Sequence, residues 1–140
     1  MSELKAIVNK IASSGKGILA ADESNGTMTK RLEGVKIQST AENRLNFRNT
    51  LFTSNAMKTC IGGVILYDET IRQENNSQKI PNIISQSGAV PGIKVDTGAK
   101  VMANSSQEKI TEGLDGLRER LKDYYSLGAR FTKWRGVFTI

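Results

Sequence analysis

The sequence contains no histidine among its 140 residues. Histidine is the usual zinc ligand and the usual general base near neutral pH. Any chemistry in this chain therefore falls to lysine, carboxylate, hydroxyl or tyrosine groups. A single cysteine, Cys60, excludes an internal disulfide and gives no sign of an oxidising compartment.

Long apolar runs are missing as well. The longest strongly apolar run, Cys60 to Tyr67, is far too short to span a bilayer. Glu3 and Lys5 interrupt the N-terminal region where a secretory signal needs an apolar core. We therefore expect a soluble, cytoplasmic protein with no membrane partner. The hydrophobic content of 38% and charged content of 24% are typical of globular chains, and the length suits one domain over residues 1–140.

Positive charge is in excess, with 20 lysine and arginine residues against 14 acidic ones and a net charge of +6. This balance suits nucleic acid, an anionic membrane or a phosphorylated substrate equally well. A nucleic-acid-binding motif of interleaved aromatic and basic residues is absent, and the cations fall at the ends of apolar segments instead. We expect no nucleic-acid partner; tight binding with a steep salt dependence would favour one.

Apolar segments typical of strands alternate with amphipathic segments typical of helices. The predicted strands are Gly17–Ala21, Cys60–Tyr67, Ala89–Asp96 and Arg130–Phe138. The predicted helices are Leu4–Ala12, a short one within Gly26–Leu32, one from Ser39 to about Thr53, and Leu114–Leu127. Expected helix caps and stops are Ser2, Gly15, Ser39 in a capping box with Glu42, and Gly128. The segments 68–79 and 97–107 are expected to be polar connections.

This alternation predicts an α/β fold with a parallel sheet. An open nucleotide-binding sheet should carry a glycine-rich phosphate motif after its first strand, and Gly15-Lys16-Gly17 precedes that strand and matches no such motif. Its absence favours the closed (β/α)8 TIM barrel, which needs roughly 250 residues. Four predicted strands make about half of such a barrel, so on architecture alone we expect the chain to be an incomplete barrel domain with two unprotected edges.

Charged side chains lie at the ends of three predicted strands. Asp22 follows the first strand, Lys94 lies in the third, and Lys133 and Arg135 lie two apart in the fourth. Because the carboxyl ends of barrel strands build the active site, these groups are expected to converge on one anionic ligand. Each has a simpler alternative, since an aspartate after a strand often caps a helix and a strand lysine or arginine often faces solvent.

A second feature is the segment Ser24–Leu32, in which two hydroxyls, Ser24 and Thr27, flank Gly26 ahead of a short helix. A helix N-terminus with hydroxyls and a nearby Arg31 is a candidate phosphate site. The alternative is an ordinary capped turn.

Five segments resemble those of one known family in their order along the chain. They are GKGILAADES (Gly15–Ser24), GGVILYDET (Gly62–Thr70), GIKVD (Gly92–Asp96), GLDGLRERL (Gly113–Leu121) and GARFTKWR (Gly128–Arg135). Together they are similar to class I fructose-bisphosphate aldolase, over essentially the whole chain. The resemblance implies a (β/α)8 TIM barrel, of which residues 1–140 supply roughly the first four β/α units as the N-terminal part of a single barrel domain. It implies an enzyme that cleaves fructose 1,6-bisphosphate reversibly to dihydroxyacetone phosphate and glyceraldehyde 3-phosphate. It implies a lysine Schiff base, no metal and no cofactor, and a homo-oligomer for the full-length enzyme.

The resemblance also implies residue roles. Asp22 matches the aspartate that handles protons around the imine, and Lys133 matches the active-site lysine beside it. The residues matching those that bind substrate and its phosphates are Ser24, Thr27, Arg31, Arg44, Lys94 and Arg135. At Thr27 the family usually has serine.

Other family residues have no match in this sequence. The imine-forming lysine, a catalytic glutamate and the residues that grip the 1-phosphate lie on later strands of the family's barrel. We therefore expect this chain to act as part of a complete enzyme and to lack aldol cleavage on its own. The alternative is a non-catalytic product of a truncated or split gene that at most binds phosphates weakly.

Overall fold

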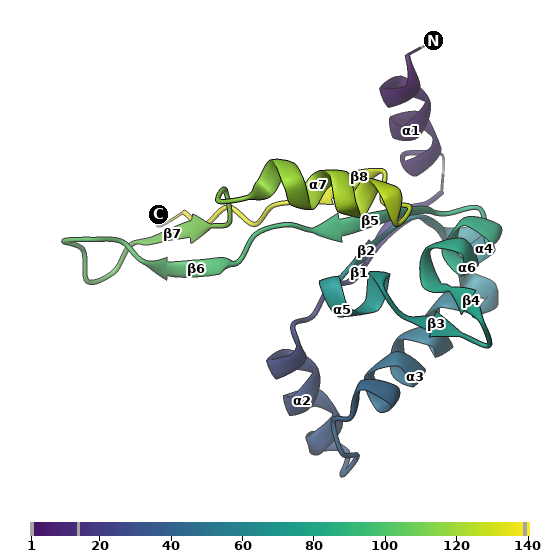
Figure 1. Cartoon of the computed structure of the whole chain (residues 1–140), viewed down its shortest axis with the longest axis horizontal. Helices are drawn as coiled ribbons and strands as arrows, with labels where there is room; N and C mark the ends of the chain where they lie inside the picture. Colours follow the sequence, from purple (N-terminus) through teal and green to yellow (C-terminus); the bar gives the residue numbers. More distant parts are fainter. Residues whose placement is uncertain (1, 14, 139) are drawn as a thin grey trace.

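The computed structural model describes residues 2–13, 15–138 and 140 (Figure 1). The helices are α1 (Glu3–Ile11), α2 (Asn25–Gly34), α3 (Ala41–Phe52), α4 (Asn55–Cys60), α5 (Asp68–Ile71), α6 (Ile80–Gln86) and α7 (Leu117–Ser126). The strands are β1 (Gly17–Ala21), β2 (Ile61–Leu66), β3 (Glu74–Asn75), β4 (Gln78–Lys79), β5 (Val90–Lys94), β6 (Gly98–Val101), β7 (Lys109–Glu112) and β8 (Phe131–Lys133).

Four of these strands form one parallel sheet in the order β1-β2-β5-β8 (Figure 1). They are the four strands that the sequence predicts, and they lie in the sheet in sequence order. Helices connect successive strands, as parallel pairing requires. The predicted α/β architecture with a parallel sheet is confirmed.

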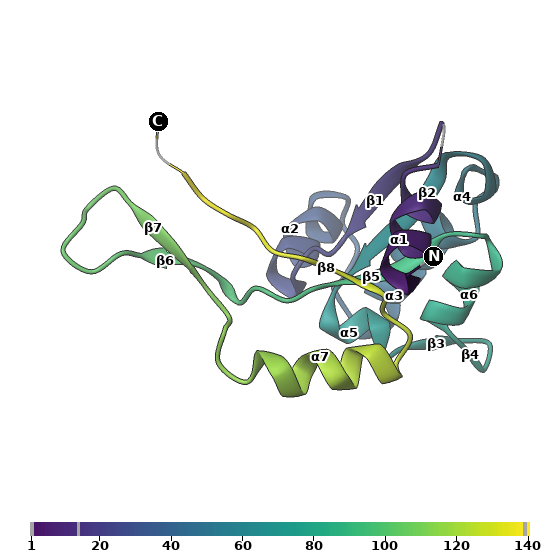
Figure 2. The same cartoon turned by 90° about the horizontal axis from the view of Figure 1, so that it is seen from above.

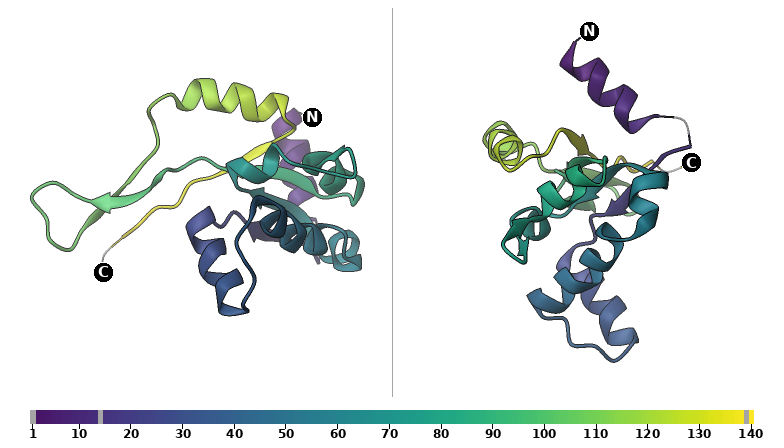
Figure 3. Two further views of the ribbon diagram at one scale, coloured as in Figure 1. Left: turned by 60° about the horizontal axis from the view of Figure 1, so that its bottom comes forward. Right: turned by 90° about the vertical axis from the view of Figure 1, so that its right-hand side faces the viewer.

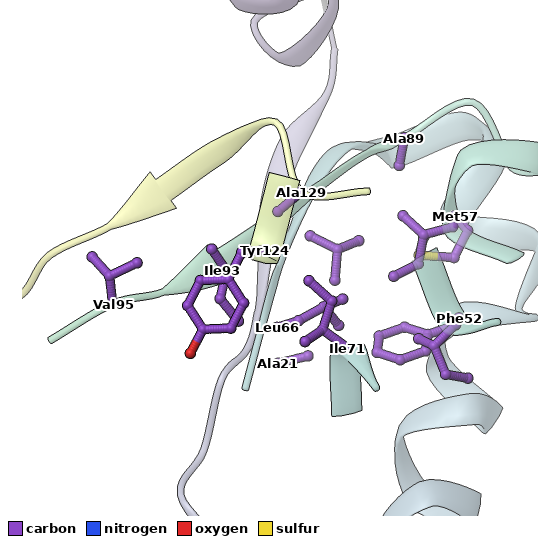
Figure 4. Packing of buried hydrophobic residues seen from close by; sticks show 13 residues of the cluster. Ala21, Phe52, Met57, Leu66, Ile71, Ala89, Ile93, Val95, Tyr124 and Ala129 are labelled. Atoms are coloured by element: carbon purple, nitrogen blue, oxygen red, sulfur yellow. The ribbon is translucent and has the colours of Figure 1, made fainter. Parts of the chain in front are cut away.

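The register gives the sheet two different faces. Ala21, Leu66 and Ile93 form one row across β1, β2 and β5 and are fully buried. They belong to the main hydrophobic core, together with Phe52 of α3 and Tyr124 of α7 (Figure 4). Because side chains alternate along a strand, this row faces the helices, and the neighbouring positions face the other side of the sheet.

That other face carries small and partly exposed residues. Ala20, Ile65, Gly92 and Phe131 occupy one row across the four strands. A Cβ added to Gly92 would collide with the Phe131 ring, so the glycine lets this ring lie across the sheet. Asp22, Lys94 and Lys133 follow on the same face two residues further along their strands.

Two parts extend away from the sheet. The antiparallel β6–β7 hairpin projects to one side (Figures 1 and 2), and α1 stands apart from the other helices (Figure 3). No residue of α1 is buried, and Leu4 and Val8 are 74% and 59% exposed.

The predicted N-terminal cap of α1 is confirmed, since the Ser2 hydroxyl accepts a hydrogen bond from the Lys5 N–H. The predicted end at Gly15 is wrong, because the helix ends at Ile11.

Several local predictions need correction. Thr40, not Ser39, caps α3, because its hydroxyl accepts from the Asn43 N–H at 3.0 Å. The segment predicted as a loop at 97–107 contains β6, and the polar connection at 68–79 contains α5, β3 and β4. β8 is also shorter than predicted, since pairing ends at Lys133.

Candidate active site

The predicted polar residues surround one cleft at the carboxyl ends of the parallel strands. The cleft has a volume of about 820 Å³. Its lining includes seven of the eight predicted site residues, namely Asp22, Ser24, Thr27, Arg31, Lys94, Lys133 and Arg135. The convergence expected from the strand pattern is therefore present.

Asp22 and Lys133 form an ion pair at the base of the cleft. The Lys133 Nζ donates to Asp22 Oδ2 at 2.5 Å, with the side chains 32% and 11% exposed. Their strands are the two outer ones, which a flat sheet would separate by about 14 Å at 4.8 Å per step. Because the side chains nevertheless meet, the sheet curves around the cleft, as the wall of a barrel does.

Lys94 is held by another acidic residue that lines the cleft, Asp96. The Lys94 Nζ donates to Asp96 Oδ1 and to the Asp96 carbonyl, both at 2.7 Å. Register places Lys94 directly opposite Lys133. Two ammonium groups on neighbouring strands repel each other, and each therefore has its own carboxylate partner. The site thus brings both lysines to the cleft.

Arg135 lies beyond the end of β8, so strand alternation does not place its side chain. Its backbone is fixed by two hydrogen bonds: its N–H donates to Asp96 Oδ2 at 3.3 Å, and its carbonyl accepts from the Thr111 hydroxyl at 2.6 Å. Both partners lie on or beside the β6–β7 hairpin. The residue is exposed and still lines the cleft.

The opposite wall of the cleft is the N-terminus of α2. Ser24 caps this helix and accepts from the Thr27 N–H at 3.4 Å, and the two hydroxyl oxygens lie 3.2 Å apart. Ser24 therefore caps the helix, as the capped-turn alternative predicts, and the Ser24 and Thr27 hydroxyls also line the cleft. Arg31, one turn further along, pairs with Glu23 and is exposed.

Arg44 is not brought to the cleft. It lies on α3 and donates from Nε and Nη2 to the two carboxylate oxygens of Glu69 on α5, at 2.9 and 2.5 Å. The hydrogen bond from Arg44 lowers the pKa of Glu69 below its ordinary value, against a smaller opposing effect of burial. In this structure the arginine joins two helices.

Sequence reasoning missed Asp96 and Arg48. Asp96 stands two residues after Lys94, so the same alternation could have placed it on the cleft side. Arg48 is fully buried behind the cleft, where it donates to the Glu23 carbonyl at 2.5 Å and to the Thr70 hydroxyl at 2.7 Å. Burial lowers its pKa, partly offset by the charges of Glu23 and Glu69. No periodic pattern marks such a residue.

Within residues 2–13, 15–138 and 140 there is no group of three or more cysteine, aspartate or glutamate residues arranged to hold a metal ion. Among those same residues, no helix is both long and apolar enough to cross a membrane.

Comparison with known proteins identifies the family. The family model described as fructose-bisphosphate aldolase class-I matches residues 3–140. The chain belongs to this family. A fructose-bisphosphate aldolase 2 of Plasmodium berghei is 46% identical over 99% of the chain. A probable class 1 fructose-bisphosphate aldolase of Xylella fastidiosa is 47% identical over the whole chain.

The fold of this class I aldolase chain matches a solved relative closely. A ternary co-crystal structure of the Plasmodium falciparum aldolase, in complex with TRAP and a small-molecule inhibitor, superposes with a TM-score of 0.91 at 45% identity over 95% of this chain. The four-stranded parallel sheet is therefore part of a TIM barrel. The chain spans 38% and 42% of the length of the two curated relatives and 39% of the solved one.

Proposed function

We propose that this chain supplies the first part of an aldolase active site that cleaves fructose 1,6-bisphosphate reversibly to dihydroxyacetone phosphate and glyceraldehyde 3-phosphate. The observation that carries this proposal is the Asp22–Lys133 ion pair in a cleft shared with Lys94 and Arg135. Membership of the class I aldolase family supports the reaction type.

The Asp22–Lys133 pair is suited to proton transfer beside a carbonyl carbon. A carboxylate and an ammonium at 2.5 Å can hold or pass a proton, and positioned groups of this kind contribute to catalysis by general acid and base action. A cation here also favours the neutral form of a neighbouring amine. We propose that the charge of Lys133 favours the neutral, nucleophilic form of the imine-forming lysine in the complete enzyme. No lysine of this chain matches the position of that imine-forming lysine.

The remaining groups are suited to a phosphate. Lys94 and Arg135 provide cations on one side of the cleft, and Ser24 and Thr27 provide hydroxyls at the N-terminus of α2 on the other. Helix N-termini and charge-assisted hydrogen bonds both favour phosphate oxygens. A sugar bisphosphate offers the negative charge that these cations need. We propose that the chain binds the 6-phosphate here, with Arg31 contributing at the rim.

We propose that the nucleophile comes from another part of the barrel. We propose that residues 1–140 alone do not cleave the substrate and that they act when assembled with the remaining strands. For the complete enzyme we further propose a homo-oligomer without metal or cofactor, as the family resemblance implies, and a cytoplasmic location, as the sequence pattern leads us to expect.

Complementation tests this function. The chain is mixed or co-expressed with the C-terminal portion of the Xylella fastidiosa relative, beginning after the position that matches Ile140, and cleavage of fructose 1,6-bisphosphate is measured in a coupled assay. We expect no turnover from either portion alone and measurable turnover from the pair. Lys133→Met should abolish it, and Lys122→Met, which removes an exposed lysine of α7, should not.

Trapping the imine with borohydride adds a second measurement. We expect the substrate-derived mass on the C-terminal portion only. Turnover by residues 1–140 alone would refute the proposal that the nucleophile comes from the C-terminal portion. Failure of the pair to cleave, with phosphate binding retained by the chain, would support the non-catalytic alternative.

A further inference from the structure

A buried carboxylate lies beneath the cations of the cleft. The Asp96 side chain is 1% exposed and makes three hydrogen bonds, and its backbone carbonyl accepts a fourth. We propose that Asp96 is a positioning residue, which holds Lys94 and the segment carrying Arg135 in the arrangement that receives a phosphate group. The ligand in this statement rests on the function proposed above, whereas the positioning does not.

The first step of the argument is the geometry of Lys94. An ammonium group has three N–H donors. Two of them point to Asp96, at 2.7 Å to Oδ1 and 2.7 Å to its carbonyl oxygen. The third donor remains for a ligand in the cleft. Asp96 therefore fixes both the place and the direction of the lysine, and a flexible four-carbon side chain becomes a preorganised donor.

The second step is the link between the two strands. The last backbone hydrogen bond between the two strands runs from the Val95 N–H to the Lys133 carbonyl at 3.1 Å. Just beyond it, Asp96 Oδ2 accepts a hydrogen bond from the Arg135 N–H at 3.3 Å. Oδ1 also accepts from the Gly98 N–H at 3.2 Å, where the hairpin begins. One carboxylate thus joins the ends of β5 and β8 at the point from which Arg135 enters the cleft.

The third step is electrostatic. Burial acts to raise the pKa of Asp96, but the hydrogen bond and charge of Lys94, the Arg135 N–H and the charge of Lys133 outweigh it and leave this pKa below its ordinary value. The carboxylate is therefore ionised at neutral pH. Lys133 has a different partner, Asp22, so the two opposed lysines are held by separate acids.

Those separate partners allow a crossed experiment on the 140-residue chain. Each lysine is labelled with a small amine-reactive reagent, and its modification rate is read by mass spectrometry. In the wild-type chain we expect Lys94 to react more slowly than Lys109, an exposed lysine of the hairpin. Asp96→Asn should accelerate Lys94 by about tenfold, the scale of a lost charge-assisted hydrogen bond, and accelerate Lys133 far less, because Lys133 keeps its hydrogen bond to Asp22. Asp22→Asn should accelerate Lys133 and leave Lys94 slow.

These labelling rates test the positioning role of Asp96 without any measurement of enzyme activity. It is overturned if Lys94 reacts as fast as Lys109 in the wild type, if Asp96→Asn does not accelerate Lys94, or if that variant accelerates Lys94 and Lys133 equally. Should Asp96→Asn fail to fold, the wild-type comparison between Lys94 and Lys109 still decides.

Kinetics of the complemented enzyme test whether the groups that Asp96 positions bind the substrate. Asp96→Asn should raise KM for fructose 1,6-bisphosphate more than it lowers kcat, and its effect on KM should be smaller in a Lys94→Met background, where only the Arg135 segment remains for Asp96 to hold. An equal KM effect in both backgrounds would count against positioning through Lys94. If complementation yields no activity, the proposed function fails, and the labelling result stands by itself.

Discussion

Arg48 is a charged residue at a position where helix patterning predicts none. Its side chain is 0% exposed, and its guanidinium lies between the Glu23 carbonyl of the cleft wall and the Thr70 hydroxyl of α5. Arginine stays protonated even when burial lowers its pKa, so this charge must be compensated locally. Arg48 therefore supports the segment that holds Asp22 and Ser24.

Replacing Arg48 by methionine should destabilise the chain strongly. The apolar side chain fills similar space but leaves the Glu23 carbonyl and the Thr70 hydroxyl without the hydrogen bonds that Arg48 donates. We expect a loss of about 2–4 kcal/mol in the free energy of unfolding, measured by urea denaturation. Arg118→Met, at an exposed position of α7, is the control and should change it by less than about 0.5 kcal/mol. Equal effects of the two substitutions would contradict the role of Arg48.

Gly62 is a residue at which backbone contact allows no side chain. A Cβ at this position would collide with the Ile11 carbonyl oxygen at the end of α1. Gly62→Ala should therefore displace α1 or destabilise the chain by about 1–3 kcal/mol, seen as faster proteolysis within residues 3–11 and a lower urea midpoint. Gly17→Ala is the control, because no atom lies within 4 Å of the place that its methyl group would occupy. An unchanged α1 in Gly62→Ala would disprove the contact.

The site residues were predictable to the extent that they follow strand alternation. Asp22, Lys94 and Lys133 stand at the ends of apolar runs, and the period of two places them on one face. Arg48 was not predictable, because an arginine within a helix ordinarily faces solvent. In the structure it is buried on α3 together with Phe52, whereas Phe47 and Leu51 of the same helix are exposed.

At the scale of elements, the four strands of the sheet and the helices α2, α3 and α7 were predictable, and the other connections were not. β1, β2 and β5 lie in short, mostly apolar runs and β8 lies in a run with Phe131 and Trp134, a signal carried by local sequence. The short helix α5 and the β6–β7 hairpin have weak local signals and depend on tertiary partners. For example, the Thr111 hydroxyl of β7 donates to the Arg135 carbonyl, beyond β8, at 2.6 Å.

The link between α3 and α5 should make stability depend on pH. The pKa of Glu69 is lowered from its ordinary value of 4.5, chiefly by the hydrogen bond from Arg44. A carboxylate with a lowered pKa stabilises the folded state above its unfolded-state pKa, and this contribution is lost as the pH falls through the folded-state value. Glu69→Gln should therefore cost about 1–2 kcal/mol at pH 7, and the difference from wild type should shrink below pH 4.5.

The matched control for this pH effect is Glu119→Gln, which removes an exposed carboxylate from α7. Urea denaturation at several pH values from 3 to 7 measures both variants. A difference between Glu69→Gln and wild type that stays constant over this range would show that the Arg44–Glu69 pair does not titrate as described.

At the scale of the whole molecule, the sheet has two outer strands that pair on one side only. Within the part of the chain that the structure describes, β1 bonds to β2 and β8 bonds to β5, and neither has a second neighbour. The face that turns away from the helices is also incompletely covered, with Ile18 half exposed. A closed barrel removes both conditions, since it has no edges and fills its interior with side chains.

Hydrogen exchange should resolve this difference between strands. Amides of β2 and β5 lie between two neighbours and should exchange more slowly than those of β1 and β8, by about tenfold or more, because edge strands open locally at lower free energy. Exchange is measured by mass spectrometry on peptides that cover each strand. Adding the C-terminal portion of the Xylella fastidiosa relative should slow β1 and β8 specifically and leave the β6–β7 hairpin as a reference. Equal exchange in all four strands, or no slowing of the outer two on mixing, would show that the remaining barrel strands do not pair at these edges.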